Sequence, residues 1–402
     1  MNRRVFITGY GVITAIGGNG PENFASLRDR KCGYGRLEFL ETRYQDDIYC
    51  CEIKLSDEAL CRRAGVSTGC GFTRTTLLGL IAIREAIASA GLTEQEVRNA
   101  GLVSATTAGG IRELEKHFFE RQDLQSSGDF ITFLDTVDPG EHMERLADIL
   151  GMKRYLATVS TACSSSANAL LFGARLIKTG LADCMICGGA EALAKITING
   201  FNALMILDRE HCKPFDQNRC GLNLGEGAAY LVLEAEESLK RSGKKAIAEL
   251  TGYANFNDAF HQTASSPEGA GALKAMRKAL KMAGINPSDV DYINAHGTGT
   301  ENNDLSEGLA LETLFGVNVP PFSSTKPYTG HTTSAAGSVE AAFCLMAFEN
   351  DIIYPNINFK QPMEELNIRP TTALKTNAGL KNILTNSLGF GGSTTSLLFA
   401  KC

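Results

Sequence analysis

The chain has 402 residues, of which 44% are hydrophobic and 21% charged, and its formal net charge is −6. This composition predicts a globular protein and argues against general nucleic-acid binding, and no apolar stretch approaches the roughly 18 residues of a membrane helix. The segment from Met1 to Gly11 has too few apolar residues for a secretion signal, and twelve cysteines without such a signal favour reduced thiols, so we expect a soluble cytoplasmic protein.

The first half alternates short apolar runs with amphipathic segments, which is the pattern of an α/β protein. Gly9-Tyr10-Gly11 should end the first strand in a turn. A strand followed by helical spacing places Cys163 at the tip of a helix, at the sheet edge where ligands bind in such folds. The expected strands are 4–8, 100–105, 155–161 and 183–189, and the expected helices are 72–90 and 163–178.

The second half has the same alternation, which predicts two pseudo-repeated halves, 1–250 and 251–402. His296 and His331 each follow a predicted strand and precede a predicted helix. Asn302-Asn303-Asp304 is a candidate helix cap. The expected strands are 290–295, 322–326, 385–388 and 396–400, and the expected helices are 305–315 and 337–349.

Cys163 is the candidate nucleophile. It lies in Thr161-Ala162-Cys163-Ser164-Ser165-Ser166, where small side chains leave room for a substrate. The positive end of a helix dipole favours the thiolate, so we expect an activated thiol. A buried packing cysteine is the alternative for any one of twelve. Cys184 and Cys187 form a CxxC within an apolar strand, but no second pair completes a metal-ligand set, so we expect no metal site.

Two of the six histidines have a setting suited to ligand binding. His296 begins His296-Gly297-Thr298-Gly299-Thr300, and His331 ends Thr329-Gly330-His331, where glycine lets the backbone approach a ligand. Two neutral imidazoles donating to one carbonyl oxygen would stabilise an enolate. Lys326 would keep the local charge balanced, with a solvated strand end as the alternative, and Glu340 is placed to pair with it.

Four ordered motifs resemble those of the elongating β-ketoacyl-acyl carrier protein synthases of the synthase II type, in the thiolase superfamily. The resemblance covers essentially the whole chain. The motifs are the Cys163 segment, His296 to Thr300, Ser324-Thr325-Lys326 with Thr329-Gly330-His331, and Asn386 to Gly392.

The resemblance implies a five-layer αβαβα fold of two halves and a decarboxylating Claisen condensation. Cys163 would take an acyl chain from acyl carrier protein, and His296 and His331 would bind the malonyl thioester oxygen, supported by Lys326 and Glu340. The amides of Cys163 and Phe390 would form the oxyanion hole. The other implied substrate-binding residues are Thr298 and Thr300 at the pantetheine arm, Phe390 as a gate, and Ala108 and Phe201.

The Cys-His-His set separates this chain from degradative thiolases, which use a second cysteine, and from initiating synthases, which use Cys-His-Asn. The resemblance implies no cofactor and no metal, because the substrates arrive on the phosphopantetheine arm of acyl carrier protein. It also implies a dimer, with a homodimer expected and a heterodimer as the alternative. A polyketide or aryl-polyene ketosynthase and a non-catalytic chain-length-factor-like subunit remain alternative functions.

Three positions depart from the family pattern. Leu388 replaces a phenylalanine, Ser334 stands where glycine is common, and Ala108 replaces a bulkier residue that presses on the acyl pocket. Ala108 therefore predicts a pocket that is more permissive at its floor. For docking of the carrier protein, Arg62, Arg63, Arg74 and Lys213 are candidates for a basic patch, with scattered surface charge as the alternative.

Overall fold

The computed structural model describes residues 3–69, 71–118, 122, 125 and 128–402. Met1 and Asn2, which entered the prediction about a secretion signal, lie outside this part of the chain. Within the described ranges, no helix is long and apolar enough to cross a membrane.

Ten strands form a continuous sheet in the order β3-β2-β4-β5-β1-β6-β12-β11-β7-β8. β1 and β6 pair through only two residues on each strand, Phe6 and Ile7 with Ala248 and Glu249, and so join two five-stranded sheets. The first five are β1 (Val5–Thr14), β2 (Gly101–Ala105), β3 (Arg154–Val159), β4 (Cys184–Glu191) and β5 (Gly227–Ala235). The second five are β6 (Ala248–Asn257), β7 (Tyr292–Asn294), β8 (Phe322–Ser323), β11 (Asn382–Leu388) and β12 (Ser393–Lys401), and β9 (Ile352–Ile353) pairs with β10 (Lys375–Thr376) apart from them.

The two sheets have the same topology. When the strands of each half are numbered in chain order, both sheets have the order 3-2-4-5-1. In both, the second strand is parallel to its two neighbours, and the remaining pairs are antiparallel. The loops after β3 and β8 are therefore equivalent, and so are the loops after β2 and β7. The boundary expected between residues 250 and 251 falls inside β6, because the first strand of the second sheet already begins at Ala248.

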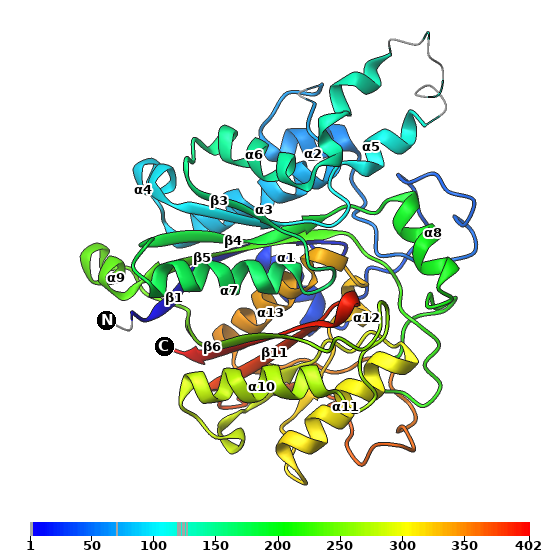
Figure 1. Cartoon of the computed structure of the whole chain (residues 1–402), viewed down its shortest axis with the longest axis vertical. Helices are drawn as coiled ribbons and strands as arrows, with labels where there is room; N and C mark the ends of the chain where they lie inside the picture. Colours follow the sequence, from blue (N-terminus) through cyan, green and yellow to red (C-terminus); the bar gives the residue numbers. More distant parts are fainter. Residues whose placement is uncertain (1–2, 70, 119–121, 123–124, 126–127) are drawn as a thin grey trace.

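Helices and sheets alternate in five layers (Figure 1). α3 and α6 cover the first sheet, α7 and α13 lie between the sheets, and α10 and α11 cover the second sheet. The α-helices are α1 (Gly20–Arg28), α2 (Asp57–Ala64), α3 (Arg74–Ala90), α4 (Glu94–Asn99), α5 (Ile111–Lys116), α6 (Pro139–Leu150), α7 (Ser165–Lys178), α8 (Lys195–Ala203), α9 (Glu236–Ser242), α10 (Ala270–Ala283), α11 (Glu301–Phe315), α12 (Lys326–Thr329) and α13 (Ala336–Asn350). The short 3₁₀ segments are Asp129–Phe133, Asp135–Val137, Pro287–Asp289, Thr333–Ala335 and Phe390–Gly392.

The two central helices differ from surface helices in their burial. Every residue of α13 from Ala336 to Phe348 is buried, because the helix lies between two sheets. α7 and α13 pack closely, and a Cβ on Gly337 would lie 2.8 Å from the backbone nitrogen of Ala167. The glycine therefore allows the helices that follow the two key loops to meet.

The predicted turn at Gly9-Tyr10-Gly11 is wrong, because β1 continues through it to Thr14. Both glycines allow α3 to pack against the strand. A Cβ on Gly9 would lie 2.4 Å from the backbone nitrogen of Ala90, and one on Gly11 would lie 2.1 Å from the carbonyl oxygen of Ala82. Close helix packing explains these glycines, which a local reading interprets as a turn.

Among the other boundaries that differ from prediction, two lie close to the histidine loops. The strand expected over 322–326 ends at Ser323, and Lys326 begins α12 instead, where proline follows at the next position. The helix expected from Leu305 begins at Glu301 with Thr300 as its N-cap residue. Asp304 therefore lies inside the helix and is free to bond elsewhere.

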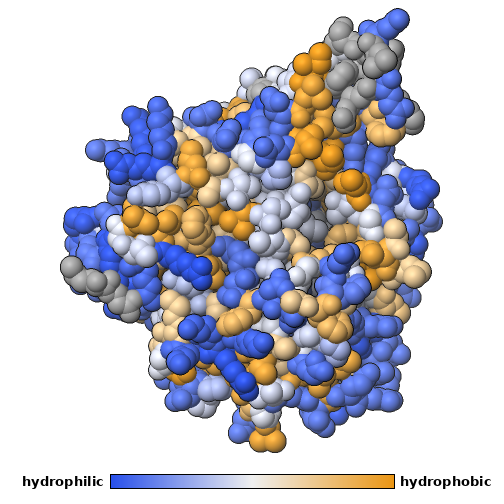
Figure 2. All heavy atoms as spheres, in the orientation of Figure 1, coloured by the Kyte–Doolittle hydropathy of each residue, from blue (hydrophilic) through white to orange (hydrophobic). Residues whose placement is uncertain are grey.

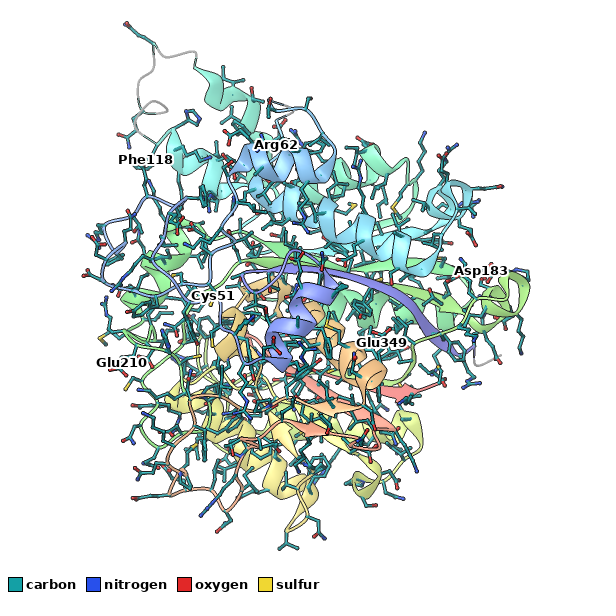
Figure 3. The ribbon with its side chains drawn as sticks, turned by 180° about the vertical axis from the view of Figure 1, so that it is seen from behind. Cys51, Arg62, Phe118, Asp183, Glu210 and Glu349 are labelled. Carbon is teal, nitrogen blue, oxygen red and sulfur yellow. The ribbon has the colours of Figure 1, made fainter. Side chains whose placement is uncertain are left out.

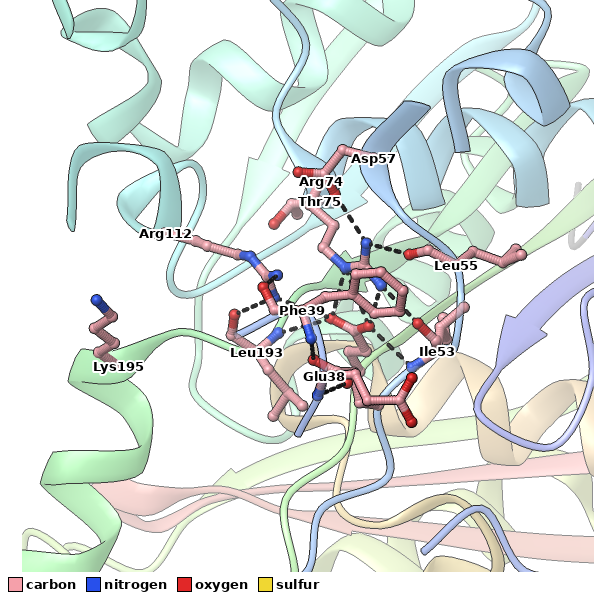
Figure 4. A network of polar contacts seen from close by, with 12 residues as sticks. Glu38, Phe39, Ile53, Leu55, Asp57, Arg74, Thr75, Arg112, Leu193 and Lys195 are labelled. Atoms are coloured by element: carbon pink, nitrogen blue, oxygen red, sulfur yellow. Dashed lines mark hydrogen bonds and ion pairs between the residues drawn. The ribbon is translucent and has the colours of Figure 1, made fainter. Parts of the chain in front are cut away.

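Arg74 does not belong to a surface patch, which corrects that prediction. It is 1% exposed and bonds Glu226, Asp57 and the main-chain oxygens of Ile53 and Leu55 (Figure 4). The same cluster holds the segment that enters α8, since Glu226 accepts from the amide of Leu193 and Arg112 donates to the carbonyl of Leu193.

Two of the other three basic residues, Arg62 and Arg63, are neighbours on α2, whereas Lys213 lies between α8 and β5. Arg62 on α2 is exposed (Figure 3), and Arg63 donates to the carbonyl oxygen of Gly18. Lys213 is paired with Glu210, which lies at the edge of the molecule in the same view. These four positions do not form one basic surface.

Candidate active site

Equivalent loops of the two halves meet at one site. Cys163 follows β3 and precedes α7, and His331 follows β8 and α12 and precedes α13. His296 follows β7, whose equivalent in the first half, β2, leads to Ala108. Because parallel strands end at the same edge of a sheet, these loops gather there. Cys163, His296 and His331 line one cavity of about 320 Å³.

The turn before Cys163 holds an unusual backbone conformation. Ala162 has a φ of +51°, which is strained for a residue with a Cβ. Ser165 supports the turn by accepting from the amide of Thr161 at 2.8 Å and donating to the carbonyl of Ala162 at 2.5 Å. Gly389 approaches from the second half, where a Cβ would lie 2.8 Å from the carbonyl oxygen of Thr161. The turn presents the thiol to the cavity.

The expectation of a resting thiolate needs correction. Cys163 is 6% exposed, and burial raises the pKa of its thiol to about 11. Lys326 and the backbone amides of Phe390 and Cys163 act in the opposite direction and lower that pKa, but they do not overcome burial. The resting group is therefore a thiol.

His296 is oriented by a buried lysine. Lys326 Nζ lies 3.1 Å from Nδ1 of His296 and donates to its main-chain oxygen at 2.5 Å, and it pairs with Glu340. An ammonium has only donors, so Nδ1 accepts and the ring proton of His296 is on Nε2. Burial, followed by the charge of Lys326, holds the pKa of His296 well below its usual value. His296 is therefore a neutral donor.

Glu340 is a buried acid beside this lysine. Burial raises its pKa to about 7, although the charge of Lys326 lowers it. Both side chains are at most 3% exposed. The pair is therefore part of the interior of the site, and the alternative of a solvated Lys326 is wrong.

His331 is held by its main chain and leaves its side chain unoccupied. Its amide donates to the carbonyl of Asn223 at 2.7 Å, and its carbonyl accepts from the amide of Gly225 at 3.0 Å. Neither ring nitrogen has a hydrogen-bond partner among the described residues, although the residue is 1% exposed. Its ring centroid lies 5.3 Å from that of His296. Burial and the charge of Lys326 lower its pKa well below its usual value, so this ring is also neutral.

Two carboxylates shape the His296 loop: Glu307, which the sequence did not single out, and Asp304, which was expected only as part of a helix cap. Glu307 accepts from the amides of His296 and Gly297, both at 2.9 Å. Asp304 accepts from the amides of Thr298 at 3.0 Å and Gly299 at 3.1 Å. Both lie in the first two turns of α11. The sequence signal that could have identified them is the presence of acidic residues at the start of a helix that follows a glycine-rich loop.

Phe390 lies in a tethered loop beside Cys163. Gly391 donates to the carbonyl of Gln262 at 2.7 Å, and Asn257 donates to the carbonyl of Gly391 at 2.7 Å. The ring of Phe390 stacks on that of Phe201 at 5.6 Å between centroids. This stack joins a loop of the second half to α8 of the first.

Two cavities meet at Cys163, and both include Phe201 and Phe390. The first also contains His296, His331 and the hydroxyls of Thr298 and Thr300, which lie 2.9 Å apart. The second, of about 700 Å³, is mainly apolar and includes Ala108. The site therefore has a polar approach that contains both histidines and an apolar compartment on the other side of the thiol.

The sequence matches two family descriptions. Residues 2–239 match the β-ketoacyl synthase N-terminal domain, and residues 247–360 match the β-ketoacyl synthase C-terminal domain. A curated relative, 3-oxoacyl-[acyl-carrier-protein] synthase 2 of Staphylococcus aureus (strain COL), is 32% identical over 419 residues, covering 100% of this chain and 99% of that protein.

Solved structures resemble the chain over its full length. The ishigamide ketosynthase/chain length factor superposes with a TM-score of 0.92 at 29% identity, with 100% of both chains covered. AntDE:AntF, described as a type II polyketide synthase acyl-carrier protein in complex with its ketosynthase bound to the hexaketide, superposes with a TM-score of 0.87 at 26% identity, again with both chains fully covered.

Proposed function

The chain belongs to the β-ketoacyl synthase family, and we propose that it elongates an acyl chain held on Cys163 by decarboxylating condensation with a malonyl group on acyl carrier protein. The observation that carries this proposal is the meeting of one thiol and two neutral imidazoles in one cavity. The product is a 3-oxoacyl-acyl carrier protein, with carbon dioxide released.

The first step loads the enzyme. Sγ of Cys163 attacks the carbonyl carbon of the acyl thioester, and the bond from that carbon to the pantetheine sulfur breaks. The thiol proton leaves with the departing pantetheine thiolate. In this proposal the amides of Cys163 and Phe390, two residues that line the same cavity, stabilise the oxyanion of the tetrahedral intermediate. The acyl chain then lies in the apolar cavity that contains Ala108.

The second step forms the carbon-carbon bond. The malonyl carboxylate leaves as carbon dioxide, and its bonding electrons form an enolate whose oxygen accepts from Nε2–H of His296 and from His331. Neutral donors suit this step because they stabilise the developing charge without giving up a proton. The enolate carbon attacks the acyl carbonyl on Cys163, and collapse of the intermediate expels the Cys163 thiolate, which regains a proton.

We propose a homodimer. β3 is an edge strand whose outer side has no partner in the described chain, and Tyr155 and Leu156 on it are 42% and 38% exposed. Apolar side chains are also exposed on the face that carries α7 (Figure 2), including Phe172. Exposed apolar edges are usually covered by a partner strand. A heterodimer is the alternative, because one of the similar solved structures is described as a ketosynthase/chain length factor.

The apolar cavity supports the same assembly. Val137, Ile196 and Leu204 line it and yet are 45%, 57% and 42% exposed. In a single chain this compartment is therefore open on one side, and a partner subunit would close it. Acyl carrier protein is the proposed second partner, and we propose a cytoplasmic enzyme that needs no bound cofactor, since its substrates arrive on the phosphopantetheine arm.

Intact-mass measurement tests the proposed function. Incubation with acyl-acyl carrier protein is expected to add one acyl mass to the wild-type chain and none to Cys163→Ala. Cys187→Ala serves as a matched control, because Cys187 is fully buried in β4 and its variant should still be loaded. Failure of the wild type to accept any acyl donor would instead favour a non-catalytic subunit.

Ala108 gives a prediction about chain length. Ala108→Ile inserts a branched side chain into the apolar cavity, so loading of long acyl chains should fall by roughly tenfold relative to short ones, because an overpacked pocket costs about 1–3 kcal/mol. Comparison of Cys163 loading rates across a series of acyl donors measures this. An unchanged profile would remove Ala108 as a determinant of specificity.

A further inference from the structure

Glu191 is a buried carboxylate at the end of β4, 2% exposed. Its oxygens accept from the hydroxyl of Thr106 at 2.8 Å, the amide of Thr107 at 2.9 Å and the amide of Ala108 at 3.0 Å. The hydroxyls of Thr107 and Ser334 also donate to it. Among the described residues its carboxylate forms no ion pair. Five neutral hydrogen-bond donors therefore satisfy the carboxylate of Glu191 where a cation would otherwise do so.

Such an arrangement is costly to keep in a protein interior. Burying an unpaired charge is unfavourable unless hydrogen bonds satisfy it, and removing a donor leaves the charge short of a partner. Here the donors come from both halves of the chain, four from the loop after β2 and one, Ser334, from the loop between His331 and α13. Glu191 therefore joins these two loops directly.

Both loops form walls of the apolar cavity that contains Cys163. Thr107 and Ala108 line it from the first half, and Thr333 lines it from the second. Thr333 has a φ of +44°, which is strained for a β-branched residue and must be held by its surroundings. Ser334 follows it directly and bonds Glu191. Glu191 does not line the cavity, so it would act on the acyl chain only through these residues.

We propose that Glu191 is a positioning residue that sets acyl-chain selection, by fixing the Thr107–Ala108 wall relative to the Thr333 wall through Ser334. The inference rests on the proposed function, because it concerns the cavity that holds the acyl chain on Cys163.

The decisive experiment removes only the hydrogen bond from Ser334 to Glu191. Ser334→Ala deletes the hydroxyl that donates to Glu191 and leaves all four bonds of the first wall. Ser338→Ala is the matched control, because Ser338 is also fully buried, lies four residues further along and donates to the carbonyl of Ala335 at 3.1 Å. Loading of Cys163 is measured for each variant as the ratio of rates for long and short acyl-acyl carrier proteins.

We expect Ser334→Ala to change this ratio by about threefold or more and Ser338→Ala to leave it as in the wild type. Glu191→Gln should change the ratio in the same direction by a larger factor. The side-chain NH₂ of glutamine cannot accept the hydrogen bonds that the loop donates to the carboxylate. A merely structural role would lower the melting temperature without altering the ratio.

The possible results are distinguishable. A Ser334→Ala profile equal to that of Ser338→Ala overturns the inference, as does a folded Glu191→Gln variant with the wild-type profile. If Glu191→Gln does not fold, Ser334→Ala still decides. A wild-type chain that accepts no acyl group contradicts the proposed function itself, which is a separate outcome.

Discussion

Replacing His331 by alanine is expected to reduce decarboxylation of the malonyl substrate by roughly 10²–10³-fold, the usual effect of removing one preorganised donor to a developing oxyanion. Within the part of the chain that the structure describes, neither ring nitrogen of His331 has a hydrogen-bond partner, so the variant loses no hydrogen bond there. The remaining donor, His296, would stabilise the enolate alone. The expected loss is therefore catalytic, with a nearly intact fold.

A single-turnover design separates this step from loading. Cys163 is first acylated to completion, malonyl-acyl carrier protein is then added, and the release of carbon dioxide is followed in time. His211→Ala is a suitable control, since His211 stacks on Tyr34, with ring centroids 4.1 Å apart, and does not line the cavity. Release of carbon dioxide at the wild-type rate from His331→Ala would contradict the role proposed for this ring.

Lys326→Met should have the largest effect on stability. It removes the only cation that contacts Glu340 among the described residues, and breaking a buried pair in this way costs about 3–5 kcal/mol. The double variant Lys326→Met/Glu340→Gln should recover much of that loss, because no charge then remains buried. It should stay inactive, because Nδ1 of His296 loses the donor that places its proton on Nε2.

The stability loss should also depend on pH. Burial raises the pKa of Glu340 to about 7 in the folded chain, above its unfolded value, so protonation of Glu340 favours folding and this contribution is lost as pH rises through about 7. Without Lys326, the ionised form is disfavoured further. Denaturant unfolding should therefore show a smaller deficit of Lys326→Met at about pH 5.5 than at about pH 8.5. A deficit that is equal at both values, or activity in the double variant, would contradict this account.

The sequence was most informative where a residue type and its local pattern carry the chemistry. Cys163 at a helix tip and the two strand-loop histidines could be identified from such patterns, and the structure brings them to one cavity. The Lys326–Glu340 pair followed from helical spacing after His331. Motif order and strand-helix alternation were likewise sufficient for the α/β architecture.

Features that depend on distant packing were not predictable in this way. Gly9 and Gly11 read as a turn because their reason, the approach of α3, lies some 70 residues away in the chain. Arg74 read as a surface charge because its partner, Glu226, is 152 residues distant. The prediction that the helix end favours the thiolate of Cys163 was wrong for the same reason, because burial in the assembled fold raises the pKa of the thiol.

The repeated topology also bears on how such an enzyme can be recombined. The first half contributes Cys163 and most of the apolar cavity, and the second contributes both histidines together with Thr333 and Phe390 of that cavity. A chimera joined between residues 239 and 247 would therefore exchange Cys163 and most of the cavity while keeping both histidines. The graft would not be neutral everywhere. A second half with glycine at position 334 would lack the hydroxyl that donates to Glu191. The two proteins that supply the halves should therefore be chosen so that residues 191 and 334 can form this hydrogen bond.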